Sequence, residues 1–125
     1  MKNELVSLLQ DLFQRNASTP TSLSGGAFCA SIERADDGEP WVQAKNGVLN
    51  IFFPSDNEPI QTLRDSVPTM PNEATCPDWE PWKFATIVFP ELRAVEMAEL
   101  ITDLFVHFYG FPDDTPVRTE IIDMR

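Results

Sequence analysis

The sequence predicts an α+β fold, in which an antiparallel β-meander packs against amphipathic helices from the two ends of the chain. Apolar residues recur at helical spacing near both ends, whereas residues 27–53 contain short segments that alternate between apolar and polar side chains. Strands grouped together, with helices before and after them, are typical of α+β proteins. The chain has 125 residues and shows no internal repeat or domain boundary, so we expect one domain over residues 1–125.

Two amphipathic helices are predicted from stripes of apolar residues. The first follows Asn3, which can cap it. Its stripe consists of Leu5, Leu8, Leu9, Leu12 and Phe13. The second and stronger prediction is Leu92–Phe111, which Pro90 precedes and which Gly110 and Pro112 end. Its stripe, at positions i, i+3, i+4, i+7, i+8 and i+11, consists of Met97, Leu100, Ile101, Leu104, Phe105 and Phe108.

A three-stranded meander is predicted between these helices, at Ala27–Arg34, Trp41–Lys45 and Val48–Phe53. Asp36–Glu39 is expected to form the first turn. Asn46–Gly47 is a strong hairpin signal, because a type I′ turn requires positive φ at both central residues.

The second half of the chain is less regular. Pro59–Asp65 is predicted as a short helix with proline in its first turn. Four prolines between Val67 and Pro81 make regular structure improbable there. Lys83–Phe89 is β-like, and Val117–Asp123 is expected to be the last strand. The predicted order is therefore α-β-β-β-α-(β)-α-β.

The charge balance restricts the classes of partner. Nine Lys and Arg against twenty Asp and Glu give a net charge of −11, which argues against nucleic acid and against anionic membrane surfaces. No apolar run approaches the length of a membrane span, and Met1–Glu4 begins no signal-peptide segment. We therefore expect a cytoplasmic protein that binds a protein or peptide segment, and neither nucleic acid nor membrane.

Few residues carry reaction chemistry. Cys29, in a strand, and Cys76, in the proline-rich loop, are expected to be free thiols. His107 is the only histidine. It lies near the C-terminal end of the predicted helix and four residues after Asp103, and both the helix dipole and Asp103 stabilise a protonated imidazole, so a structural role accounts for it. Acidic residues on the same stripe, Glu96 and Glu99, are expected to form a solvated face rather than a metal site. We therefore expect no catalytic residue, no cofactor and no metal, and hence not an enzyme.

Large aromatic side chains are better candidates for a binding site. Trp79 and Trp82 lie in the proline-rich loop, Trp41 begins a strand, and Phe111 follows the long helix. Aromatic residues held in loops are enriched at protein interfaces. The alternative is that they cover the open side of the domain's own sheet. The partner-binding residues predicted on this basis are Trp41, Trp79, Trp82 and Phe111.

The chain also resembles a known family. The residues that carry the resemblance are Pro40-Trp41-Val42-Gln43, Pro77-Asp78-Trp79, Ala98-Glu99-Leu100 and Tyr109-Gly110-Phe111-Pro112. With their order along the chain, they are similar to the type III secretion chaperone-like superfamily, and within it to the YbjN and TY-Chap branch. The resemblance implies a non-enzymatic chaperone or adaptor, often a homodimer, that holds a partner polypeptide in an extended form. The strand at Lys83–Phe89 departs from the family, where mostly loop is expected.

A second hypothesis is a small acidic inhibitor or immunity-type protein that blocks a basic partner. Charge complementarity supports it. The two hypotheses differ in salt dependence, because an ionic complex weakens steeply as salt rises and a hydrophobic complex does not.

Overall fold

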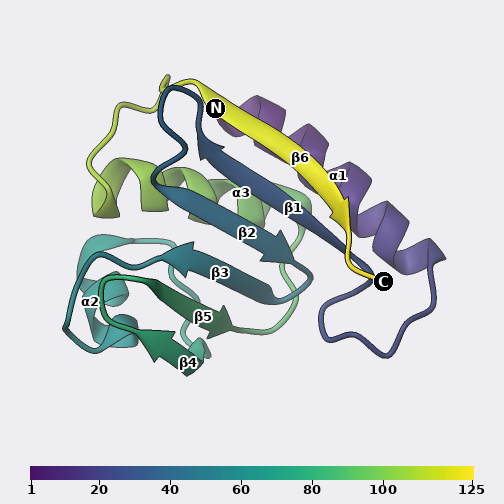
Figure 1. Ribbon diagram of the computed structural model, residues 1–125, viewed down its shortest axis with the longest axis horizontal. Helices are drawn as coiled ribbons and strands as arrows, with labels where there is room; N and C mark the ends of the chain where they lie inside the picture. Colours follow the sequence, from purple (N-terminus) through teal and green to yellow (C-terminus); the bar gives the residue numbers. More distant parts are fainter.

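The computed structural model describes all residues 1–125 and has two layers, with the helices on one face of a six-stranded antiparallel sheet (Figure 1). The strand order across the sheet is β4-β5-β3-β2-β1-β6. The elements are α1 (Lys2–Ser18), β1 (Phe28–Arg34), β2 (Trp41–Lys45), β3 (Val48–Phe52), α2 (Pro59–Ser66), β4 (Thr75–Glu80), β5 (Phe84–Val88), α3 (Ala94–Asp103), the π-helical turn η1 (Leu104–Phe108) and β6 (Val117–Asp123). The predicted α+β class is confirmed.

The core lies between the helices and one face of the sheet, which we call the covered face. The predicted stripes of both long helices supply it, although Leu8, Phe13 and Phe108 are only half-buried. No polar or charged residue belongs to the buried set. The buried helical residues of the core are Leu5, Leu9, Leu12, Leu63, Met97, Ala98, Leu100, Ile101, Leu104 and Phe105, and the buried strand residues are Ala30, Ile32, Val42, Ala44, Leu49, Ile51, Ala85 and Ile87.

The ends of the two long helices differ in how well the sequence predicted them. α1 begins at Lys2 and has no side-chain cap, so the prediction that Asn3 caps it is wrong. The long C-terminal helix stops just before Gly110, as predicted, and Gly110 has a φ of +83°. It begins at Ala94 instead of Leu92, and its last turn, Leu104–Phe108, is π-helical. The Phe111 N–H donates to the Phe105 carbonyl at 2.9 Å, one residue further back than where a left-handed glycine ends an α-helix, because the last turn is π-helical.

The proline-rich segment contains an edge strand, so the prediction of irregular structure there is wrong. β4 pairs with β5, which confirms the bracketed strand predicted at Lys83–Phe89. Pro77 is tolerated because it falls in the irregular part of the register between Thr75 and Asp78, on an edge strand where its missing N–H leaves no ladder bond unmade. Cys76 and Trp79 therefore lie in a strand and not in a loop.

The hairpin between β2 and β3 forms where predicted, with Lys45 paired to Val48. Its turn is not type I′, because Gly47 has a φ of +71° whereas Asn46 does not have positive φ. Asn46 is held from outside the turn, since its backbone N–H donates to the Gly25 carbonyl at 3.0 Å. Gly47 is required for a second reason as well, because a Cβ there would lie 2.8 Å from the Phe89 carbonyl oxygen.

Candidate functional site

The face of the sheet opposite the helices, which we call the open face, has no element packed over it. The three helices lie behind the sheet in Figure 1, so this face points toward the viewer. Polar side chains cross its middle, where Asn50 donates to the Gln43 amide oxygen at 3.3 Å and Thr86 donates to the Asn50 amide oxygen at 3.2 Å. Residues on this face are partly accessible to a partner because no second layer covers them.

One end of the open face carries a row of aromatic side chains. Phe52 and Phe84 are register partners on β3 and β5, and the Trp41 ring centroid on β2 is 6.4 Å from that of Phe52. All three are half-buried. We call Trp41, Phe52 and Phe84 the aromatic row. Tyr109 supports it from the end of η1, since its hydroxyl donates to the Phe52 carbonyl and burial raises the pKa of its phenol.

Trp82 lies at the same end of the sheet, in the turn between β4 and β5. The Lys83 N–H donates to the Glu80 carbonyl at 3.1 Å, which closes a four-residue turn with Pro81 in its second position. Trp82 occupies the third position with a φ of +65°, where glycine or asparagine is normally found. Its side chain is 63% exposed, the highest value among the exposed large hydrophobic residues. The fold thus holds a tryptophan outward in a conformation that tryptophan disfavours.

The other two predicted partner-binding residues lie elsewhere. Trp79 faces the covered side, because its register partner Ala85 is buried there, and its ring centroid is 5.9 Å from that of Phe53. Phe111 is half-buried beneath the Arg34 guanidinium, which lies 4.6 Å from its ring centroid. The structure therefore places Trp41 and Trp82 at the same end of the sheet, two strands apart, and Trp79 on the covered face.

A carboxylate stands at each end of the aromatic row. Glu33 is the register partner of Trp41, and Glu80 is the register partner of Phe84. Each has a cation beside it within the chain, Arg118 at 2.6 Å from Glu33 and Lys83 at 3.0 Å from Glu80. The site is thus an apolar strip with a carboxylate at either end.

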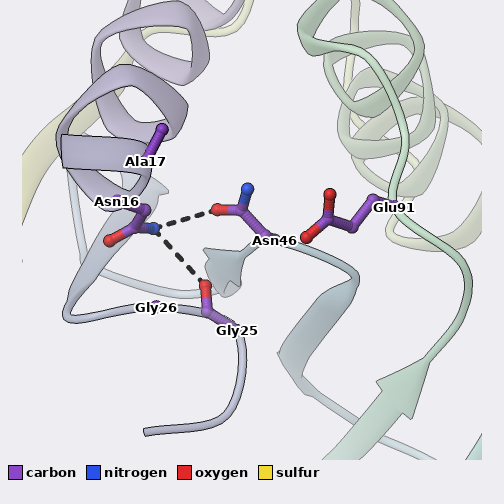
Figure 2. Close-up of a pocket in the computed structure, with 6 residues that line it drawn as sticks. All are labelled: Asn16, Ala17, Gly25, Gly26, Asn46 and Glu91. Atoms are coloured by element: carbon purple, nitrogen blue, oxygen red, sulfur yellow. Dashed lines mark hydrogen bonds between the residues drawn. The ribbon is translucent and has the colours of Figure 1, made fainter. Parts of the chain in front are cut away.

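A polar pocket lies where the end of α1 meets the turn between β2 and β3 (Figure 2). Both the nitrogen and the oxygen of the Asn16 amide are hydrogen-bonded there, and the nitrogen also lies 3.4 Å from the Gly25 carbonyl (Figure 2). Its nitrogen donates to the Asn46 amide oxygen at 2.9 Å and to the Phe28 carbonyl at 3.2 Å, and its oxygen accepts the Phe28 N–H at 2.8 Å. Gly26 gives it room, since a Cβ at that position would lie 2.3 Å from the Asn16 Cγ. These contacts fasten the end of α1 to the sheet, which accounts for Asn16 and Asn46 without a ligand.

The acidic residues predicted along one stripe of the long helix each interact with a different partner. Glu99 pairs with Lys2 at 2.8 Å, and the Arg93 backbone N–H, which donates to Glu96, lowers the pKa of that carboxyl. Asp103 accepts from Thr69 at 2.7 Å and lies 4.0 Å from His107. No group of three or more metal-ligating side chains comes together, and no pocket is lined by His107.

Both cysteines are free thiols. Burial raises the pKa of each thiol, so little thiolate is present at neutral pH. We predict that a thiol reagent labels the native protein slowly, first at half-buried Cys76 and then at buried Cys29, and labels both quickly in denaturant. Mass spectrometry of a labelling time course measures this. Rapid double labelling of the native protein would contradict the placement of both side chains.

The comparisons with known proteins place the chain in no family. No family model matches it, and neither a curated protein nor a solved structure matches it significantly. No helix has the combination of length and apolar character that crossing a membrane requires.

Proposed function

We propose that this protein is a non-enzymatic protein-binding module that holds a partner polypeptide segment on the open face of its sheet, as a chaperone or adaptor does. The single observation that carries the proposal is Trp82, a large aromatic side chain 63% exposed at a φ of +65° beside the aromatic row. Glycine or asparagine would fit this turn position better. The fold does not need the indole for its core, so contact with a partner is the role left for it.

The aromatic row supplies the rest of the binding surface. Its three rings are half-buried, and the Phe52 ring centroid lies 6.4 Å from that of Trp41 and 6.5 Å from that of Tyr109, so a partner can cover the remaining area while little side-chain freedom is lost. Tryptophan is among the residues most enriched in the small sets that dominate binding energy at interfaces. Trp41 and Trp82 together therefore offer two such anchors at one end of the sheet.

The charges suggest the chemistry of the partner segment. Glu33 and Glu80 stand at the two ends of the aromatic row, and the chain as a whole carries a net charge of −11. Because Glu33 and Glu80 already pair with Arg118 and Lys83, it is the net charge that attracts a basic segment at long range, and an apolar segment flanked by Lys or Arg would match the row. The resemblance to secretion chaperone-like proteins supports the same role.

The substitution Trp82→Asn is expected to weaken partner binding without lowering the stability of the fold. Asparagine tolerates positive φ, so we expect the free energy of unfolding to stay unchanged or rise by up to about 1 kcal/mol. Partner capture is expected to fall at least about tenfold, the effect of losing about 1.4 kcal/mol of binding energy. Denaturant unfolding gives the first quantity, and quantitative mass spectrometry of proteins captured from the native cell lysate gives the second.

Leu23→Asn is the matched control, because Leu23 is 40% exposed and lies outside the aromatic row. It should leave the captured proteins unchanged. A strongly destabilised Trp82→Asn protein would show that Trp82 packs on its own fold, and unchanged capture would show that the indole is not an anchor. Either result overturns the proposal.

The acidic-inhibitor hypothesis remains the second candidate, and the net charge of −11 is the observation that favours it. Repeating the capture at about 1 M salt, where the Debye length is about 3 Å, distinguishes the two. Loss of the partner at high salt, with capture insensitive to Trp82→Asn, would favour the inhibitor.

A further inference from the structure

β6 is an edge of the sheet with an unpaired side. β1 is its only neighbour, and all seven of its residues are in register with β1. The Ala35 N–H donates to the Pro116 carbonyl at 3.0 Å, and the Met124 N–H donates to the Ala27 carbonyl at 2.9 Å. In an antiparallel ladder only every second residue faces the partner strand, so the residues between these face away. The outward backbone groups belong to Val117, Thr119, Ile121 and Asp123.

The two edges of the sheet are not equivalent. β4 contains Pro77, which has no N–H, and an irregular register between Thr75 and Asp78, two features that protect an edge from pairing with another strand. β6 has neither proline nor irregularity over its seven residues. A further strand can therefore join the sheet in continuous register only at β6.

The charges on β6 complement a second copy of the same strand. Glu120 is exposed and forms no ion pair within its chain. Arg118 is 61% exposed, and both its nearest contacts go to one oxygen of Glu33, which leaves guanidinium donors free. A twofold axis at Thr119 would place Arg118 of each copy opposite Glu120 of the other.

Other registers lack this match. An axis at Glu120 sets two carboxylates against each other, and an axis at Ile121 sets Glu120 against Ile122. Only the axis at Thr119 satisfies both charges, and it also pairs Val117 with Ile121 on the covered face, where both are half-buried against the core.

We propose that two copies of this chain form a homodimer by antiparallel pairing of their β6 strands about Thr119. The outward groups of Val117, Thr119 and Ile121 form about six backbone hydrogen bonds between the copies. Arg118 and Glu120 fall on the non-hydrogen-bonded pairs, where side chains lie closest, so the opposite charges stabilise this pairing. The result is one continuous sheet with both open faces on the same side.

Two opposite charge reversals test this register. Arg118→Glu sets a carboxylate against Glu120 at both ends of the pairing, and Glu120→Arg sets a guanidinium against Arg118 at both ends. Each variant alone is therefore expected to be a monomer of about 14.1 kDa. An equimolar mixture restores two complementary pairs and is expected to give a heterodimer of twice that mass. Light scattering coupled to size exclusion measures the mass across a concentration series, at about 0.15 M salt to screen the net charge.

Lys83→Glu is the control, because it makes the same charge change as Arg118→Glu at the opposite edge of the sheet, and it should remain a dimer. A parent that stays monomeric at every concentration would overturn the proposal. So would single variants that stay dimeric, or a mixture of folded variants that gives no heterodimer. If Arg118→Glu does not fold after losing the ion pair with Glu33, Glu120→Arg still decides, since Glu120 has no partner within the chain.

Trp82→Asn should leave the mass unchanged, so this proposal and the proposed function can fail separately.

Discussion

Replacing Phe105 with alanine is expected to lower the free energy of unfolding by about 3–5 kcal/mol, the range for truncating a buried phenylalanine. Phe105 is fully buried at the junction of α3 and η1, and its ring centroid is 5.7 Å from that of Tyr109. The truncation leaves a cavity between the long helix and the sheet, which the surrounding side chains can only partly fill. Denaturant unfolding followed by circular dichroism measures the loss.

Val95→Ala is the control on the same helix. Val95 is 40% exposed, so its truncation should change the free energy of unfolding by no more than about 0.5 kcal/mol. If Phe105→Ala is tolerated thermally while partner capture is lost, then the apolar face of α3 is an interface and the placement of the core is wrong.

The second large effect is expected from Asn16→Ala, at about 1–3 kcal/mol of lost stability. The substitution removes an acceptor for the Phe28 N–H and a donor to the Asn46 side chain, which leaves partly buried polar groups without partners. It also releases the end of α1 from the sheet. Asn3→Ala on the same helix is the control and should be neutral within about 0.5 kcal/mol, because Asn3 is exposed and does not cap the helix.

The contact between Gly26 and Asn16 can be tested by introducing Gly26→Ala both into the parent protein and into the Asn16→Ala variant. In the parent, the new Cβ would lie 2.3 Å from the Asn16 Cγ at a φ of +113°, so both steric overlap and backbone strain oppose it. In the Asn16→Ala background only the strain remains, and Gly26→Ala should cost about 1–3 kcal/mol less. Equal costs in the two backgrounds would show that Asn16 and Gly26 do not contact each other.

Much of the fold could be predicted because its signals are local. The apolar stripe from Met97 to Phe108, the left-handed glycine at Gly110 and the meander each follow from the spacing of neighbouring residues. β4 could not be predicted, because its composition argues against a strand and only pairing with β5 at the sheet edge makes Pro77 acceptable. The turn at Asn46–Gly47 was predicted at the right place but with the wrong type for a related reason, since Gly25 and Asn16 hold Asn46 from distant parts of the chain.

The candidate site was predicted in part. Trp41 and Trp82 were identified as candidate binding aromatics, but Phe52 and Phe84 were not, although the alternation along β3 and β5 carries a signal for them. Phe52 faces the open side while the adjacent Phe53 is buried, and only the strand register shows which of the two joins Trp41.

The fold class, the net acidic charge and the core stripe of the long helix follow from the sequence alone, because these depend on composition and short-range spacing. Which aromatic residues share a surface depends on the tertiary structure. Trp79 and Trp82 are three residues apart, yet one packs on Phe53 and the other extends from a turn. Successive side chains of a strand point to opposite faces, so the face each occupies is fixed by pairing with distant strands.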